Sequence, residues 1–233
     1  MVLLGTLVNG LAIGIGAFLG LFLSGMRPDI RETVMQGISL VVILIGVTMA
    51  LQSDHMFLIL IAILIGSLIG SFLGLERGLN RLGTWAERRL GGDRSFSTGF
   101  VTATLVYCVG PMAVLGGMDS GLRGDHQILF TKAMLDGFSA IIFSSTLGVG
   151  VLLSFVPVVL YQGVIALSAG WMTKVIGPEW LEPMVLQVTA VGGILIIAIG
   201  LNLLKVTSIR VGDMLPALVV AAVAAWLEQV WLS

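Results

Sequence analysis

The sequence predicts an all-α polytopic membrane protein with about eight transmembrane helices, forming a single transmembrane domain over residues 1–233. Two observations carry this prediction. Of the 233 residues, 57% are apolar and 11% are charged, whereas soluble domains average about 45–50% and about 25%. The apolar residues also fall in long uninterrupted stretches, which a bilayer core requires of each spanning helix because lipid offers no hydrogen-bond partners.

The spans are the stretches without Asp, Glu, Lys, Arg or His, which lie at residues 1–26, 33–53, 56–75, 95–118, 137–173, 183–204 and 214–227. The fifth stretch is about twice the length of one span, and residues 154–157 near its middle predict the turn of a tight helical hairpin. Helices are therefore expected near residues 3–23, 35–51, 56–75, 99–118, 134–153, 158–174, 185–204 and 215–232. The first resembles the apolar part of a signal peptide, but no basic residue precedes it and no clear cleavage site follows, so we interpret it as a retained helix.

Basic residues are distributed unequally between the two predicted sides of the membrane. Loops one, three, five and seven hold nine Lys and Arg residues, against three in the other loops. By the positive-inside rule, the arginine-rich loop 76–98 is cytoplasmic and both termini lie outside. This loop can form a short basic amphipathic helix suited to the headgroup layer, with Leu79, Leu82, Trp85 and Leu90 on its apolar side. A loop that only sets the topology is the simpler alternative.

An internal duplication is a second hypothesis about organisation, because many transporters consist of two repeats of inverted topology. Sliding the chain by 100 positions aligns residues 31–71 with 131–171 without a gap, including Gly37 with Gly137. Similar identities arise by chance in sequences rich in Leu, Ile and Gly, so both explanations stay open. A real duplication would make helices 1–3 an inverted repeat of helices 4–6.

Three segments carry a resemblance to a known family: CVGPMAVLGGMDSGLRGD, LFTKAMLDGFSAIIFSSTLGVGV and, near the N-terminus, GTLVNGLAIGIGAFLG. With these segments the chain resembles the YdfK/YqgA-like bacterial inner-membrane proteins, the family of domain of unknown function 554. The most specific matching residues are Val8, Asn9, Cys108, Gly110, Met112, Gly116, Gly121, Lys132, Asp136, Gly137 and Ser139. The resemblance implies a protein of the bacterial cytoplasmic membrane with a suggested role in transport. It carries over no activity and no ligand residues.

The fourth span contains a proline in its middle, at Pro111. Proline cannot donate its amide and crowds the preceding turn, so the carbonyl of Tyr107 loses its usual partner, and Gly110 weakens the helix further. We therefore predict a kink or break near residues 107–111. Broken helices at membrane depth can coordinate an ion or an anionic group, and the hydroxyls of Thr104 and Tyr107 lie near this one. A kink that serves only packing is the alternative.

The fifth span begins with Lys132, Asp136 and Ser139, which share one helix face. An ionisable group inside a span costs roughly 2.5–3.5 kcal/mol on insertion scales, so Asp136 followed by hydroxyl groups suggests a polar cavity. The alternative is an interfacial ion pair whose lysine extends outward. Asn9 and Asn202 place carboxamides inside the first and seventh spans, where they bond either a substrate or another helix.

Other polar and small residues have simpler interpretations. Glycines recur at four-residue spacing, which predicts close helix packing and is compatible with a homo-oligomer; these ridges are Gly66, Gly70 and Gly74, and Gly16, Gly20 and Ser24. Asp213 is interpreted as an N-cap-like residue for the last helix. The pairs Asp54–His55 and Asp125–His126 are interpreted as solvated loop residues rather than metal ligands. We expect no metal, no cofactor and no nucleic-acid partner.

The leading functional hypothesis is a transporter or channel for a small solute or ion, not an enzyme. The pathway would lie among the first, fourth, fifth and seventh helices, with Asn9, Thr104, Tyr107, Gly110, Pro111, Lys132, Asp136, Ser139 and Asn202 as its residues. The second hypothesis is a membrane assembly or sensor protein that acts through helix packing and the basic cytoplasmic loop. An intramembrane enzyme ranks third, because no paired nucleophile and base is visible.

Overall fold

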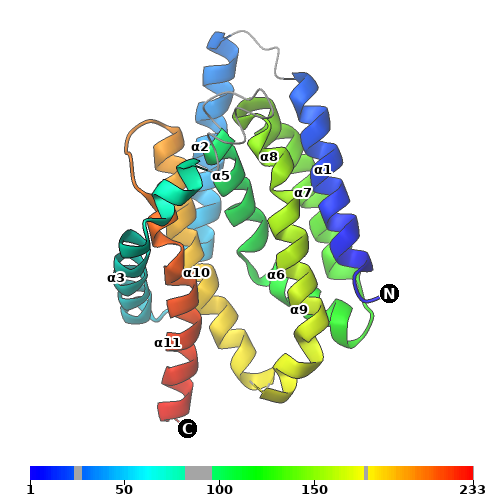
Figure 1. The fold of residues 1–233 in the computed structure, drawn as a ribbon, viewed down its shortest axis with the longest axis vertical. Coiled ribbons are helices and arrows are strands. Elements are labelled where there is room, and N and C mark those ends of the chain that lie inside the picture. Colours follow the sequence, from blue (N-terminus) through cyan, green and yellow to red (C-terminus); the bar gives the residue numbers. More distant parts are fainter. Residues whose placement is uncertain (24–27, 82–95, 176–177, 233) are drawn as a thin grey trace. The chain divides into compact units, whose positions relative to one another are not determined.

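The computed structural model describes residues 1–23, 28–81, 96–175 and 178–232, and these residues form an all-helical protein (Figure 1). Among them, seven helices are long and apolar enough to cross a membrane, and an eighth span results if one bent pair of helices counts as a single span. The predicted fold class, a polytopic helical membrane protein, is confirmed. The predicted amphipathic helix in loop 76–98 falls largely on residues 82–95, outside the described part of the chain.

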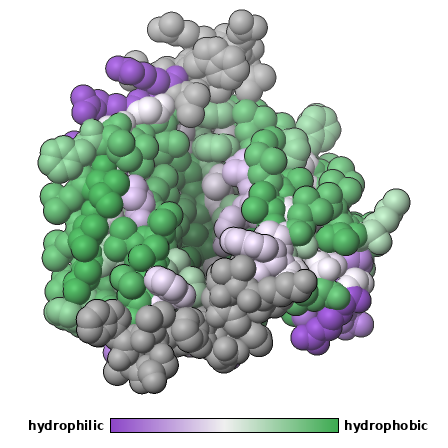
Figure 2. All heavy atoms as spheres, turned by 60° about the horizontal axis from the view of Figure 1, so that its bottom comes forward, coloured by the Kyte–Doolittle hydropathy of each residue, from purple (hydrophilic) through white to green (hydrophobic). Residues whose placement is uncertain are grey.

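Helix α1 (Leu4–Phe22) shows why these segments belong in lipid. Its buried side consists of small or polar residues: Gly5, Thr6, Asn9, Gly10, Ile13, Gly16, Ala17 and Gly20. Its exposed side carries large apolar residues, including Leu7, Leu11, Ile15 and Phe18. A soluble helix has the opposite pattern, with its large apolar residues inside. Hydrophobic residues likewise cover most of the face seen in Figure 2, and strongly hydrophilic residues gather near its edges.

The described helices group into two compact units, and each unit is discontinuous in the sequence. Unit 1, residues 1–34 and 82–175, contains α1, α5 (Phe96–Cys108), α6 (Pro111–Leu122), α7 (Gln127–Leu147), α8 (Gly150–Leu153) and α9 (Phe155–Val175). Unit 2, residues 35–81 and 176–233, contains most of α2 (Pro28–Ala50), α3 (Met56–Leu73), α10 (Pro178–Leu203), the 3₁₀ helix η2 (Val211–Met214) and α11 (Pro216–Leu232). The inverted repeat and the single domain over residues 1–233 stay predictions.

The hairpin within residues 134–174 turns earlier than the sequence predicted. Helix α7 ends at Leu147, and Gly148 has a φ of 79°, a backbone conformation that glycine adopts without strain. The expected turn at residues 154–157 is wrong, because Pro157 is the third residue of α9 and a proline is tolerated in the first turn of a helix. Helix α7 also begins at Gln127 rather than near residue 134, so Lys132 and Asp136 lie well inside it.

Within unit 1, α1 and α7 pack at backbone distance. Glycine positions on α1 face backbone carbonyls of α7: a Cβ at Gly16 would collide with the carbonyl oxygen of Gly137, and a Cβ at Gly20 with that of Ile141. Small residues let membrane helices approach each other closely. Because lipid tails are as apolar as the side chains, the helices are held together by van der Waals contacts rather than by the hydrophobic effect. The described glycines of the predicted ridge Gly16, Gly20 and Ser24 therefore pack inside the same chain.

Within unit 2, a similar contact joins α3 to η2 and to the first turn of α11. A Cβ at Gly66 would collide with Ala217, and one at Gly70 with the backbone of Asp213. Just beyond α3, the backbone N–H of Glu76 donates to Asp213 Oδ1 at 2.9 Å, and the N–H of Gly212 donates to Glu76 Oε2 at 2.8 Å. These two hydrogen bonds interlock the helical residues 75–81 with η2.

The structure assigns Asp213 a different partner from the expected one. Its carboxylate accepts from Glu76, the second residue of the helical segment 75–81, rather than from the first turn of α11. The first N–H groups of a helix have no partner within that helix, so a carboxylate from elsewhere in the chain can satisfy one of them. The role of Asp213 is structural, but it serves a helix far away in the sequence.

We expect Asp213→Ala to lower the free energy of unfolding by about 0.5–2 kcal/mol, the range found when a side-chain acceptor at a helix start is removed. Thermal unfolding in detergent, followed by tryptophan fluorescence, would measure the change. Asp213→Asn is the matched control, because its side-chain oxygen can still accept from Glu76. Equal destabilisation by both variants would contradict a role for this hydrogen bond.

Candidate functional site

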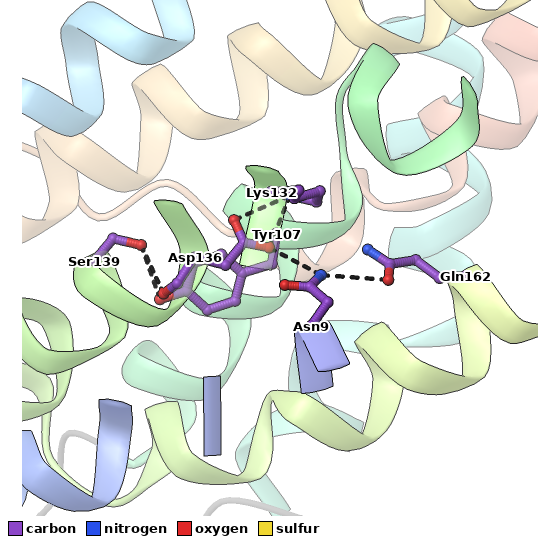
Figure 3. A network of polar contacts seen from close by, with 6 residues as sticks. All are labelled: Asn9, Tyr107, Lys132, Asp136, Ser139 and Gln162. Carbon is purple, nitrogen blue, oxygen red and sulfur yellow. Dashed lines mark hydrogen bonds and ion pairs between the residues drawn. The ribbon is translucent and has the colours of Figure 1, made fainter. Parts of the chain in front are cut away.

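Unit 1 holds a connected group of polar side chains in its interior, which we call the polar cluster (Figure 3). Its members are Asn9 on α1, Tyr107 on α5, Lys132, Asp136 and Ser139 on α7, and Gln162 on α9. Each of the four helices presents a short set of polar atoms toward the others. A membrane interior makes such groups expensive, so their gathering at one place indicates a specific role in structure or function.

An ion pair forms the centre of the polar cluster. Lys132 Nζ lies 2.8 Å from Asp136 Oδ2 and 3.0 Å from Oδ1, and the two residues are 7% and 6% exposed. Asp136 is nine residues beyond Gln127, which places it about 14 Å along α7 at 1.5 Å per residue, near half the thickness of a bilayer core. The predicted Lys–Asp pair exists, and its lysine is buried rather than extended outward.

Asn9 connects this ion pair to a third helix. Its Nδ2 donates to Asp136 Oδ2 at 3.1 Å and to Gln162 Oε1 at 3.3 Å, and both carboxamide side chains are fully buried. Sequence reasoning missed Gln162, although a carboxamide inside the predicted span 158–174 was visible. Asn9 was predicted for the site, and the structure brings it into contact with Asp136.

Ser139 and Tyr107 extend the polar cluster toward α5. The hydroxyl of Ser139 lies 3.5 Å from that of Tyr107 and donates to the backbone carbonyl of Asp136 at 3.0 Å. Tyr107 is fully buried, and its ring stacks on Phe143 with a centroid distance of 6.3 Å. The structure therefore unites Asn9, Tyr107, Lys132, Asp136 and Ser139 of the predicted pathway.

Several buried polar atoms in unit 1 have no hydrogen-bond partner among the described residues. They are Thr6 Oγ1, Asn9 Oδ1, Thr102 Oγ1, Thr104 Oγ1 and Gln162 Nε2. Two of them belong to the polar cluster. Buried polar atoms in native proteins are almost always paired with protein, water or a ligand, so each such atom needs an explanation. Here an acceptor on Asn9 and a donor on Gln162 give the polar cluster hydrogen-bonding capacity that no described residue uses.

The fourth span is broken at the predicted place. Helix α5 ends at Cys108, α6 begins at Pro111, and the two are bent by 57°. Gly110 between them has φ 138° and ψ 155°, which a side chain would make unfavourable. The proline occupies the first position of α6, where its missing N–H costs no helical hydrogen bond. The break begins two residues after Tyr107, a member of the polar cluster.

Asn202 lies in unit 2, and its side chain is engaged in a local turn. Its amide donates to the carbonyl of Ile209 at 2.7 Å, and its oxygen accepts from Thr207 Oγ1 and from the N–H of Ile209, both at 2.8 Å. All three hydrogen bonds close the segment after α10. These contacts show that Asn202 stabilises the loop after α10. A role for Asn202 in a pathway stays a prediction.

Both histidines and Ser145 have partners within the described residues. His126 Nδ1 lies 2.6 Å from Ser120 Oγ, and His55 Nδ1 lies 3.2 Å from Glu228 Oε1. Ser145 donates to a carbonyl one turn back, that of Ile142, at 2.8 Å. Within the described ranges, no group of three or more His, Cys, Asp and Glu side chains could hold a metal ion.

A separate groove lies on the outer side of unit 1, between α1 and α9. Its volume is about 380 Å³, and its lining is apolar: Leu7, Gly10, Leu11, Gly14, Ile15, Phe18, Leu19, Phe155 and Val159. Exposed neighbours on both helices are large and apolar, as expected of a surface in contact with lipid. The groove has no polar side chain and does not belong to the polar cluster.

These features define the class of protein: a polytopic helical membrane protein with a buried, charged polar cluster beside a broken helix. The chain belongs to the family described as "Protein of unknown function (DUF554)", which matches residues 4–226. This confirms the family that the sequence segments indicated.

Two curated relatives align over nearly the whole chain. The "Uncharacterized protein YqgA" of Escherichia coli (strain K12) is 31% identical over 232 residues, which cover 96% of this chain and 97% of the relative. The "Uncharacterized membrane protein YdfK" of Bacillus subtilis (strain 168) is 28% identical over 224 residues, which cover 94% of each chain. No solved structure matches the chain significantly. The printed name of the second relative agrees with the membrane character of the fold.

Proposed function

We propose that this protein moves a small solute or ion across the membrane, with the polar cluster as the binding position on its route. The buried ion pair near the middle of α7 carries the proposal, because an intramembrane charge that serves only packing is replaced easily by an apolar residue. Asn9 and Gln162 support it with an acceptor and a donor that have no partner among the described residues.

The break between α5 and α6 gives the proposed route a second element. Discontinuous helices in transporters leave backbone groups free next to the substrate, and they let the two halves of a span move separately. Here the break begins one residue after Cys108, and the preceding residue, Tyr107, contacts Ser139 of the polar cluster. The hydroxyls of Ser139 and Tyr107 therefore link the backbone of Asp136 to the broken span.

The proposed setting is the bacterial cytoplasmic membrane, with the arginine-rich loop inside and both termini outside. The distribution of Lys and Arg supports this orientation, since nine lie on one predicted side and three on the other. Labelling of single cysteines introduced near each terminus, in intact cells with a membrane-impermeant maleimide, would test it. Labelling only after cell lysis would contradict it.

We expect Asp136→Asn and Pro111→Ala each to reduce flux at least tenfold in proteoliposomes. The first variant removes the carboxylate that pairs with Lys132, and the second supplies a backbone N–H with which one helix can continue across the break. Flux of small salts and polar solutes would be followed by light scattering after an osmotic step. Asp213→Asn is the matched control, because it makes the same substitution at another buried aspartate.

Unchanged flux in both variants would contradict the proposed route. If liposomes with the wild-type protein are no more permeable than empty ones to any tested solute, transport is contradicted. The second hypothesis, an assembly or sensor protein acting through its basic loop, would then take its place.

A further inference from the structure

The polar cluster is electrically neutral when Lys132 and Asp136 are both ionised. The other titratable residues on helices that pack with these residues are Tyr107 and Cys108 on α5, Asp119 on α6, and Tyr161 and Lys174 on α9. Lys174 is twelve positions beyond Gln162, next to the end of α9. Asp119 pairs with Arg123 at 3.3 Å, and α1 and α8 carry no titratable side chain. The charge state of the cluster is therefore decided by one lysine and one aspartate.

The hydrogen bonds fix the direction of each amide in the polar cluster. An ionised Asp136 can only accept, so the atom of Asn9 that faces it has to be Nδ2, the donor. That same Nδ2 faces Gln162, so Gln162 turns its oxygen inward and its Nε2 away. The polar atoms of these two carboxamides without a partner among the described residues are therefore a donor, Gln162 Nε2, and an acceptor, Asn9 Oδ1.

Protonation of Asp136 would change this arrangement in a defined way. One carboxyl oxygen becomes a donor, and Asn9 already holds an acceptor, Oδ1, without a partner among the described residues. The ammonium of Lys132 loses its counter-charge, and the nearest titratable groups, Tyr107 and Cys108, are neutral in their ordinary protonated forms. A lone buried cation is strongly unfavourable, so the protonated cluster calls for a negative charge from outside the chain.

We propose that the polar cluster binds a small monovalent anion together with one proton: the anion takes the place of the carboxylate beside Lys132, and the proton rests on Asp136. The cluster then has the same net charge when empty and when occupied. Donors from two helices face this position, the ammonium of Lys132 on α7 and Asn9 Nδ2 on α1, and a half-turn of the Gln162 amide would add its unpaired Nε2 from α9. This inference deepens the proposed transport function by naming its substrate class, a proton-coupled monovalent anion.

Calorimetric titration of the purified full-length protein would test the inference. The probes are the sodium salts of chloride, nitrate, formate and acetate, with sodium gluconate as the bulky-anion control at equal ionic strength. Titration in two buffers of different ionisation enthalpy gives the number of protons taken up with the anion. We expect at least one probe to bind with uptake of about one proton, and its apparent affinity to rise about tenfold for each pH unit downward while Asp136 is ionised in the empty protein.

Variants separate the two parts of the site. Asp136→Asn should keep anion binding and lose both the proton uptake and the pH dependence, because its side chain is permanently neutral. Lys132→Gln should lose anion binding, and Gln162→Leu should weaken it about tenfold, the effect of one hydrogen bond to a charged group. Asp213→Asn should bind like the wild type. If a variant of the polar cluster does not fold, the pH dependence of anion binding to the wild type still tests the inference.

The outcomes distinguish this inference from the transport proposal. Binding of sodium in place of an anion, or anion binding without proton uptake in the wild type, would overturn the inference. Flux of a cation or a neutral solute in proteoliposomes would also overturn it and leave transport intact. Proton-linked anion binding without any flux would support the inference and contradict transport.

Discussion

Replacing Lys132 with methionine is expected to lower the free energy of unfolding by about 3–5 kcal/mol, the range found when one partner of a buried ion pair is removed. The loss arises because Asp136 stays buried without its counter-charge. The double variant Lys132→Met with Asp136→Asn should recover most of the stability, since no charge remains and Asn9 keeps an acceptor. Reversible unfolding in mixed micelles, followed by circular dichroism, would measure both.

The two single variants should respond to pH in opposite directions. In Lys132→Met the unpaired group is a carboxylate, which loses its charge on protonation. The loss in free energy of unfolding relative to the wild type should therefore shrink as the pH falls. In Asp136→Asn the unpaired group is an ammonium, which loses its charge on deprotonation. The loss in free energy of unfolding should therefore shrink as the pH rises. The same slope for both variants would show that the pair is not the source of the effect.

Gly16→Val is expected to disrupt unit 1, with a loss of at least about 3 kcal/mol or no folded protein. A Cβ at this position would overlap the backbone carbonyl of Gly137, which cannot rotate away as a side chain can. Overpacking of a core costs about 1–3 kcal/mol of the free energy of unfolding. A collision with backbone atoms should cost at least the upper value of this range. Yield of monodisperse protein and unfolding temperature would report the effect.

Gly14→Val is the matched control in the same helix. No atom lies within 4 Å of the position where its Cβ would stand, because Gly14 lines the open apolar groove. The helix and the substitution are identical, so only the packing differs. Comparable damage from both variants would mean that helix propensity, and not contact between α1 and α7, explains the loss.

The sequence predicted the features that follow from single helices. Long charge-free stretches located the spans, and Pro111 located the break, because both effects arise within one segment. Lys132 and Asp136 were found together because a spacing of four residues places them on one helix face. These signals depend on local chemistry and need no knowledge of the tertiary fold.

Contacts between segments far apart in the chain could not be predicted from the sequence. Gln162 was missed because its significance comes from Asn9, which lies 153 positions away in the chain. Asp213 was predicted to cap the start of the last helix, the nearest one in the sequence, whereas its carboxylate accepts from the backbone N–H of Glu76. The hairpin turn was predicted at residues 154–157 instead of at Gly148, because a proline in the first turn of a helix and one in a turn look alike in a sequence.

The close contact between α1 and α7 decides which parts of unit 1 can move. Because Gly16 and Gly20 lie against carbonyls of α7, these helices cannot slide or separate without breaking contact along several turns. Asn9 and Asp136 should therefore travel as one rigid body. In the transport function proposed above, alternating access would then require α5 and α6 to swing about a hinge at Gly110, opening first one side of the solute and then the other.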